Sequence, residues 1–135
     1  MEKILIVDDD PVFLILLHRT LLDEGYQAIK AQGSQEAISA MENESFDLVI
    51  TDLLMPDMDG IELTRIMLGI DPKLPIIIIT GSGYFDKVAE ALKIGAYDFV
   101  AKPFELKKIC TTIKNALDYR KIKSGHPEGQ GEKSA

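Results

Sequence analysis

Cysteine, tryptophan and long apolar runs are scarce in this sequence of 135 residues, which has one cysteine and no tryptophan. The lone Cys110 excludes an internal disulfide and is typical of a protein from a reducing compartment. No apolar run approaches the roughly 20 residues that a membrane-spanning helix needs. Because the N-terminus leads straight into an apolar strand pattern without the features of a signal peptide, we expect a cytoplasmic protein with no membrane contact.

Basic residues are also fewer than acidic ones: the chain has 15 Lys and Arg and 22 Asp and Glu, which gives a net charge of −7. Nucleic acids are held through clustered Lys and Arg, so this balance argues against direct nucleic-acid binding and suits a bound cation instead. The 46% hydrophobic and 27% charged residues are typical of an ordinary globular protein. A chain of this length buries roughly 68% of its unfolded surface, which is enough for one independent core.

Short apolar runs alternate with helical patterns five times along the chain. The expected strands are Lys3 to Val7, Tyr26 to Ala31, Leu48 to Thr51, Ile76 to Thr80 and Tyr97 to Ala101. The helical segments are residues 11–24, 34–43, about 60–69, 85–94 and 105–121. This alternation predicts a three-layer α/β domain with a parallel sheet.

Capping signals mark the starts of three helices. Asp10 precedes Pro11, which is favourable at the first helical position. Ser34 is the expected cap of the second helix, and Asp59 with Glu62 resembles a capping box at the third. Residues 55–60, which contain Pro56 and an Asp-Gly pair, are expected to form a loop.

Residues 1–122 are expected to form a single domain. Residues 123–135 are rich in Gly and polar side chains and cannot add to a core, so we expect a disordered tail or the remnant of a linker. The sequence leaves open whether the domain acts alone or belongs to a longer protein.

Polar groups follow four of the five expected strands. Asp8 and Asp9 follow the first, Asp52 follows the third, Thr80 ends the fourth, and Lys102 follows the fifth. Since the carboxyl ends of parallel strands share one edge of the sheet, these groups are expected to converge there. Three crowded carboxylates either raise one another's pKa or bind a divalent cation, and Mg²⁺ is the hard, oxygen-seeking ion that suits them.

These residues and their order resemble the receiver domain of bacterial two-component response regulators. The resemblance rests on the Asp8-Asp9 pair, Asp52 with the loop LLMPDMDG, Thr80 after four isoleucines, and Lys102-Pro103 after AYDFVA. It covers about residues 3–121. It implies a (βα)5 flavodoxin-like, CheY-like sandwich with strand order 2-1-3-4-5, counting the expected strands along the chain.

The resemblance also implies a role for each site residue. Asp52 is expected to accept a phosphoryl group from the phosphohistidine of a histidine kinase or phosphotransfer domain. Mg²⁺ is expected to bind Asp9 and Asp52 through side chains, Asp8 mostly through water, and Leu54 through its backbone carbonyl. Lys102 is expected to pair with the phosphoryl oxygens, and its bond to Pro103 is expected to be cis.

Further positions are implied to govern switching and lifetime. Thr80 is expected to move toward the phosphoryl group, and Phe99 is the switch aromatic, where other members carry Tyr. Leu54 and Ser82 match the positions that tune the aspartyl-phosphate lifetime; neither supplies an acid or amide, so slow self-dephosphorylation is expected and no turnover enzyme. Phosphorylation is then expected to shift the face of the fourth helix, fifth strand and fifth helix, where an effector or a second copy of the chain can bind.

The sequence also allows two other functional interpretations. Asp8 to Val12 also resembles the nucleophile motif of haloacid-dehalogenase-type phosphatases, with Asp8 as nucleophile, but Pro11 begins a helix where that family places a flap. A degenerate receiver acting only as a docking module is disfavoured because every expected acid is present. Basic residues of the last helix form either a solvated face or a docking surface; they are Lys107, Lys108, Lys114, Arg120 and Lys121.

Overall fold

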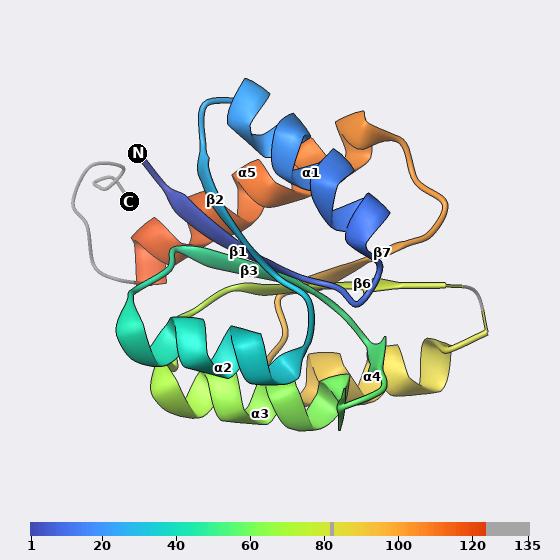
Figure 1. Cartoon of the computed structure of the whole chain (residues 1–135). Coiled ribbons are helices and arrows are strands. Elements are labelled where there is room, and N and C mark those ends of the chain that lie inside the picture. The colour runs from blue at the N-terminus through green and yellow to red at the C-terminus, as the bar shows by residue number, and fades with distance from the viewer. Residues whose placement is uncertain (82, 124–135) are drawn as a thin grey trace.

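The computed structural model describes residues 1–81 and 83–123 and has a central parallel sheet between two layers of helices (Figure 1). The sheet order is β2-β1-β3-β6-β7, the predicted order once the strands are counted along the chain. Its strands are β1 (Lys3–Val7), β2 (Gln27–Ala31), β3 (Leu48–Asp52), β6 (Ile76–Thr80) and β7 (Asp98–Ala101). The helices are α1 (Pro11–Asp23), α2 (Ser34–Asn43), α3 (Gly60–Ile70), α4 (Phe85–Ile94) and α5 (Leu106–Lys123).

The two faces of the sheet are covered by different helices. Alternate side chains of β1, such as Ile4 and Ile6, join the core under α1 and α5, while Leu5 and Val7 join the core above α2, α3 and α4. This alternation follows from the two-residue period of a strand. The central strands β1, β3 and β6 are therefore apolar on both faces, which explains the unbroken run of four isoleucines in β6.

Most of the expected helix ends are present. The Asp10 carboxylate caps α1, accepting hydrogen bonds from the N–H groups of Val12 and Phe13. Asp59 caps α3 and accepts from the N–H of Ile61. The prediction for α2 is wrong in one respect, because the N-cap is Gly33 and Ser34 lies inside the first turn, where it is fully buried.

The loop after β3 is more ordered than predicted. It contains a minimal antiparallel hairpin of β4 (Leu54–Met55) and β5 (Met58–Asp59), in which Leu54 pairs with Asp59. Gly60 follows at a close approach of backbones: a Cβ there would lie 2.5 Å from the carbonyl oxygen of Leu53. A glycine is therefore needed to join the hairpin to α3.

Within residues 1–81 and 83–123, no helix is both long and apolar enough to cross a bilayer. The expected tail and Ser82 lie outside the described residues, apart from Lys123, which ends α5.

Candidate functional site

Three carboxylates meet at the edge of the sheet where the parallel strands end. Asp8 and Asp9 follow β1, and Asp52 is the last residue of the neighbouring β3. Each of the three offers an oxygen atom, and these oxygens all lie within 4.8 Å of one another. The strand order places β1 beside β3, so the topology itself brings the acids together.

Lys102 supplies the positive charge of this cluster. Its Nζ atom lies 3.1 Å from Oδ2 of Asp8 and 3.7 Å from Oδ2 of Asp52. The backbone of Lys102 is fixed by a 2.7 Å hydrogen bond from its N–H to the carbonyl of Thr80, and the Lys102–Pro103 peptide bond is cis. The side chain thus reaches back from the end of β7 over two neighbouring strands.

Asp8 is the most deeply buried of the three acids, with only 1% of its surface exposed. Burial raises the pKa of its carboxyl above the usual 3.8, and the nearby Asp52 adds to this, while the N–H of Asp10 and the ammonium of Lys102 oppose it. A single lysine therefore does not fully compensate the buried negative charge. This donor set of carboxylate oxygens with unbalanced charge fits a hard divalent cation.

Asp52 is more accessible than Asp8. Its side chain is 15% exposed, against 1% for that of Asp8. One carboxylate oxygen, Oδ1, accepts a hydrogen bond from the N–H of Leu54 at 3.3 Å, and Oδ2 faces Lys102. Asp52 is therefore held in orientation while remaining open to a reagent that approaches the rim.

Thr80 lies on β6, which pairs with the strand of Asp52, and Phe99 lies on β7, one strand further along the sheet. Thr80 ends β6, is 2% exposed, and its hydroxyl donates to the carbonyl of Gly81 at 3.2 Å. Phe99 is half-buried on β7 opposite Ile78, and its ring meets that of Phe85 of α4 edge-on, with centroids 6.4 Å apart. The aromatic ring thus connects the site edge of the sheet to α4.

Phe13 was not identified from the sequence. The Lys102 ammonium lies 4.4 Å from the centroid of its ring, within cation–π range. Phe13 also packs edge-on against Phe104, which follows the cis peptide bond. The sequence carries one signal for Phe13, its position in the first turn of α1 shortly after the acids, and an aromatic residue at such a position is typical of the core.

Comparison with known proteins identifies the family. The model of the response regulator receiver domain matches residues 4–114. The chain belongs to the response regulator receiver family. It is 40% identical over 116 residues to sporulation initiation phosphotransferase F of Bacillus subtilis, covering 86% of this chain and 94% of that protein. It is 33% identical to the C4-dicarboxylate transport transcriptional regulatory protein DctD of Rhizobium meliloti, of which it spans only 26%.

Solved structures agree with this assignment. A CheY-like response regulator receiver domain protein from Methanospirillum hungatei has a TM-score of 0.88 and 32% identity, covering 91% of this chain and 98% of that one. The receiver domain from Clostridium thermocellum has a TM-score of 0.87 and 31% identity over 90% of this chain and 98% of that one. The predicted flavodoxin-like α/β fold and the membership in the receiver family are confirmed.

As a receiver domain, this protein is a phosphoacceptor of two-component signalling. Membership in the receiver family argues against the phosphatase alternative. The geometry also disfavours it, because Asp8, its required nucleophile, is buried and engaged by both Lys102 and the N–H of Asp10.

Proposed function

We propose that Asp52 is the phosphoacceptor. The observation that carries this is the pairing of the accessible Asp52 carboxylate with the Lys102 ammonium beside two further acids. A carboxylate oxygen of Asp52 attacks the phosphorus of a phosphohistidine on a kinase or phosphotransfer domain. The P–N bond breaks, its electron pair returns to the imidazole, and an aspartyl phosphate forms.

We propose Mg²⁺ as the cofactor, held by the side chains of Asp9 and Asp52, by the backbone carbonyl of Leu54, and by Asp8 through water. A bound Mg²⁺ would supply positive charge that neutralises the phosphoryl oxygens. Lys102 would pair with a phosphoryl oxygen on Asp52. Mg²⁺ commonly keeps several waters and few carboxylates, which this open cluster permits.

The switch acts through Thr80 and Phe99. The Thr80 hydroxyl turns from the Gly81 carbonyl to a phosphoryl oxygen, and Phe99 moves into the space that it leaves. Since the Phe99 ring contacts Phe85, this movement changes the packing of α4. The phosphorylated state favours one of two packings of the α4, β7 and α5 face.

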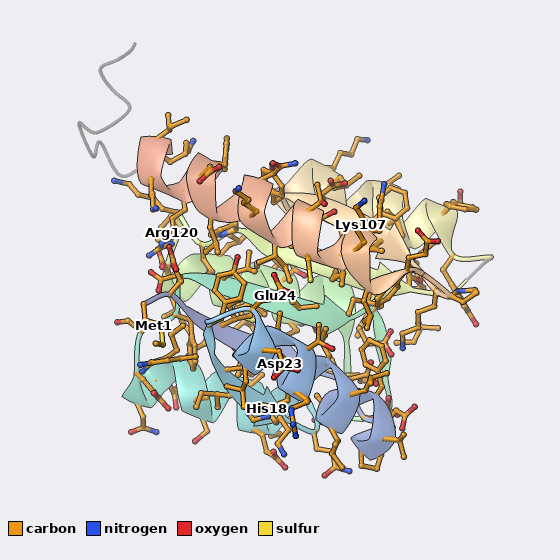
Figure 2. The ribbon with its side chains drawn as sticks, turned by 90° about the horizontal axis from the view of Figure 1, so that it is seen from above. Met1, His18, Asp23, Glu24, Lys107 and Arg120 are labelled. Atoms are coloured by element: carbon orange, nitrogen blue, oxygen red, sulfur yellow. The ribbon has the colours of Figure 1, made fainter. Side chains whose placement is uncertain are left out.

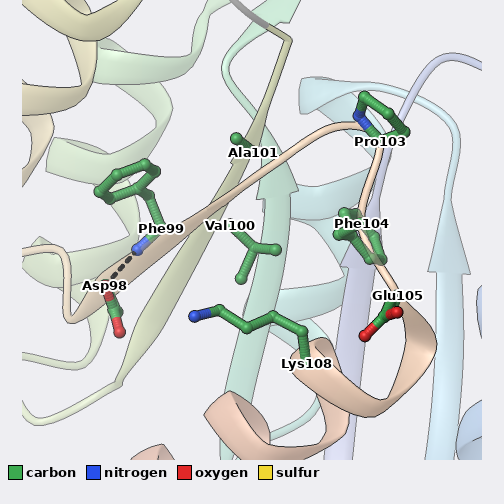
Figure 3. A pocket seen from close by; sticks show the side chains of 8 residues that line it. All are labelled: Asp98, Phe99, Val100, Ala101, Pro103, Phe104, Glu105 and Lys108. Carbon is green, nitrogen blue, oxygen red and sulfur yellow. Dashed lines mark hydrogen bonds between the residues drawn. The ribbon is translucent and has the colours of Figure 1, made fainter.

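The groove in Figure 3 is the proposed site at which a downstream effector or a second copy of this chain reads that change. It has a volume of about 510 Å³ and is formed by β7, the segment after the cis peptide bond and the start of α5. Phe99 lies at its edge, with the charged side chains of Asp98, Glu105 and Lys108 around it. Movement of Phe99 would therefore alter the groove directly.

The phosphodonor is proposed to dock elsewhere, on α1. Three apolar side chains of α1 are 54–72% exposed; they are Val12, Ile15 and Leu16. Exposing so much apolar surface to water on one helix is unfavourable and is typical of a surface that a partner covers. Their helix begins directly beside the acidic cluster, so a partner that covers them can present its phosphohistidine to Asp52.

We propose that Arg120 stabilises the fold instead of contacting a partner. It is 21% exposed and pairs with Asp71 at 3.1 Å and Asp47 at 3.9 Å. Figure 2 shows it at the end of α5 near Met1, away from Lys107 at the start of that helix. Only the other basic residues of α5 remain candidates for partner contacts, and Lys121 among them lies 3.6 Å from Glu2.

We further propose residues 1–122 as the functional domain, a cytoplasmic location, and no turnover activity beyond slow self-dephosphorylation. The last point rests on Leu54 and Ser82, which lack an acid or amide to orient a hydrolytic water. The phosphoprotein, isolated from its donor, should keep its label for minutes or longer in Mg²⁺. A half-life of seconds would contradict this.

The proposed function is tested by incubating the protein with acetyl phosphate and measuring its intact mass. The wild type should gain one phosphoryl group only when Mg²⁺ is present, and Asp52→Asn should gain none. Lack of any gain in the wild type, with a known receiver domain labelled in the same buffer, would count against the phosphoacceptor proposal.

A further inference from the structure

The N-cap residue of α2 has no side chain that could accept a hydrogen bond from the helix. This residue is Gly33, whereas α1 and α3 are capped by their own Asp10 and Asp59. Glu36 in the first turn of α2 accepts a hydrogen bond from the N–H of Gln32 at 3.0 Å, one residue before the N–H that a capping box would bind. A protein acceptor for the early N–H groups of α2 can therefore come only from another part of the chain.

That acceptor is Asp57, in the turn of the β4–β5 hairpin. Its Oδ2 atom accepts a hydrogen bond from the N–H of Gln35, the second residue of α2, at 3.2 Å and across 22 positions of sequence. Slight burial opposes ionisation of Asp57, but the N–H groups of Gln35 and Ser34 outweigh it and hold its pKa below the usual 3.8. A carboxylate is thus present at the positive end of α2, where it is favourable.

Gly33 leaves the room that this contact needs. A Cβ at position 33 would lie 3.1 Å from Oδ2 of Asp57, closer than an ordinary van der Waals contact. The φ of Gly33 is −176°, which any residue can adopt. Space for the Asp57 carboxylate, and not backbone freedom, is therefore what glycine provides here.

The cap holds a segment that needs support. β4 and β5 have two residues each, and so small a hairpin is marginal by itself. The same hairpin carries Leu54, whose N–H binds Asp52. We propose that Asp57 is a positioning residue, which by capping α2 from another part of the chain holds the Leu54 carbonyl and Asp52 in place for Mg²⁺. This inference rests on the proposed function.

The test compares Asp57→Ala with the double variant Asp57→Ala, Gly33→Ser. A serine at position 33 restores a cap to α2 from within the helix, but leaves the hairpin without its anchor. Mg²⁺ affinity is measured by titration followed through amide chemical shifts, and the state of the cap by hydrogen exchange of the Gln35 amide. Glu42→Gln is the matched control, because it removes one exposed negative charge from the same helix.

In Asp57→Ala we expect faster exchange at Gln35 and Mg²⁺ affinity weaker by about tenfold, the lower end of the range for groups that orient metal ligands. In the double variant, exchange at Gln35 should slow again while Mg²⁺ affinity stays weak. Glu42→Gln should match the wild type in both.

Recovery of both properties in the double variant would show that Asp57 only stabilises α2, and would overturn the inference. Equal Mg²⁺ affinity in wild type and Asp57→Ala would overturn it as well. Absence of Mg²⁺ binding in the wild type would instead refute the proposed cofactor, and Asp57 would then have no ion to position.

Discussion

The ammonium of Lys102 is shared between two acids, 3.1 Å from Asp8 and 3.7 Å from Asp52. The shorter contact goes to the buried acid, and the longer one to the acid that is open to a reagent. A phosphoryl group on Asp52 would bring new negative oxygens toward this one cation. The contact between Lys102 and Asp8 is therefore the interaction that phosphorylation competes with directly.

Replacing Asp8 by Asn should stabilise the protein when no metal is present. The raised pKa of Asp8 means that the folded state favours its protonated form. Protonated Asp8 therefore favours the folded state, and this contribution is fully present below the unfolded pKa of about 3.9. It is lost as the pH rises through the higher folded pKa and the buried carboxylate becomes charged. In EDTA, the advantage of Asp8→Asn in urea unfolding should thus grow with pH over the acid range.

Adding Mg²⁺ to the wild type and to Asp8→Asn gives a second test of the role of Asp8. An ion that binds only the folded state adds about 2.7 kcal/mol at 100 times its dissociation constant. Mg²⁺ should therefore stabilise the wild type more than Asp8→Asn, so the difference in their free energies of unfolding should shrink. A wild type that is more stable than the variant in EDTA at neutral pH would contradict the account of Asp8.

Replacing Lys102 by Met should separate metal binding from phosphoryl transfer. Loss of the cation leaves the acidic cluster more negative, so Mg²⁺ should bind more tightly. Phosphorylation by acetyl phosphate should slow strongly, because no ammonium remains to pair with the phosphoryl oxygens. Mg²⁺ titration and the initial rate of mass gain measure the two effects, and weaker Mg²⁺ binding would count against the shared-cation view.

Arg120→Ala tests the proposal that Arg120 stabilises the fold and does not contact a partner. Its ion pairs join α5 to Asp71 after α3 and to Asp47 before β3. Their loss should lower the free energy of unfolding by about 1 kcal/mol. Phosphorylation should be unchanged, since Arg120 lies away from the acidic cluster. A slower phosphorylation with unchanged stability would reverse this assignment.

Much of the fold was predictable because local patterns and topology agree. The apolar strand runs and the Asp10 cap define elements by themselves, and parallel pairing then brings Asp8, Asp9 and Asp52 to one edge. Local preference alone predicts Ser34 as the cap of α2, which is wrong. The actual acceptor, Asp57, is 22 residues away from Gln35, so no local rule could find it.

The roles within the site were less accessible to sequence reasoning. Position at the end of a strand predicts the same role for Asp8 and Asp52. Packing distinguishes them, because it buries Asp8 and leaves Asp52 partly exposed. The cation–π contact of Phe13 depends on how far Lys102 reaches back across the sheet. In the sequence Arg120 is one of several basic residues of α5. Its pairing with Asp71, which follows α3, depends on the tertiary fold and cannot be predicted from the sequence.

The most direct test of the central claim is to locate the phosphoryl group. After labelling with acetyl phosphate and Mg²⁺, borohydride reduces an aspartyl phosphate to homoserine, and peptide mass spectrometry reads its position. The account predicts homoserine at position 52 and nowhere else in the wild type. Homoserine at position 8, with Asp52→Asn still labelled, would contradict it.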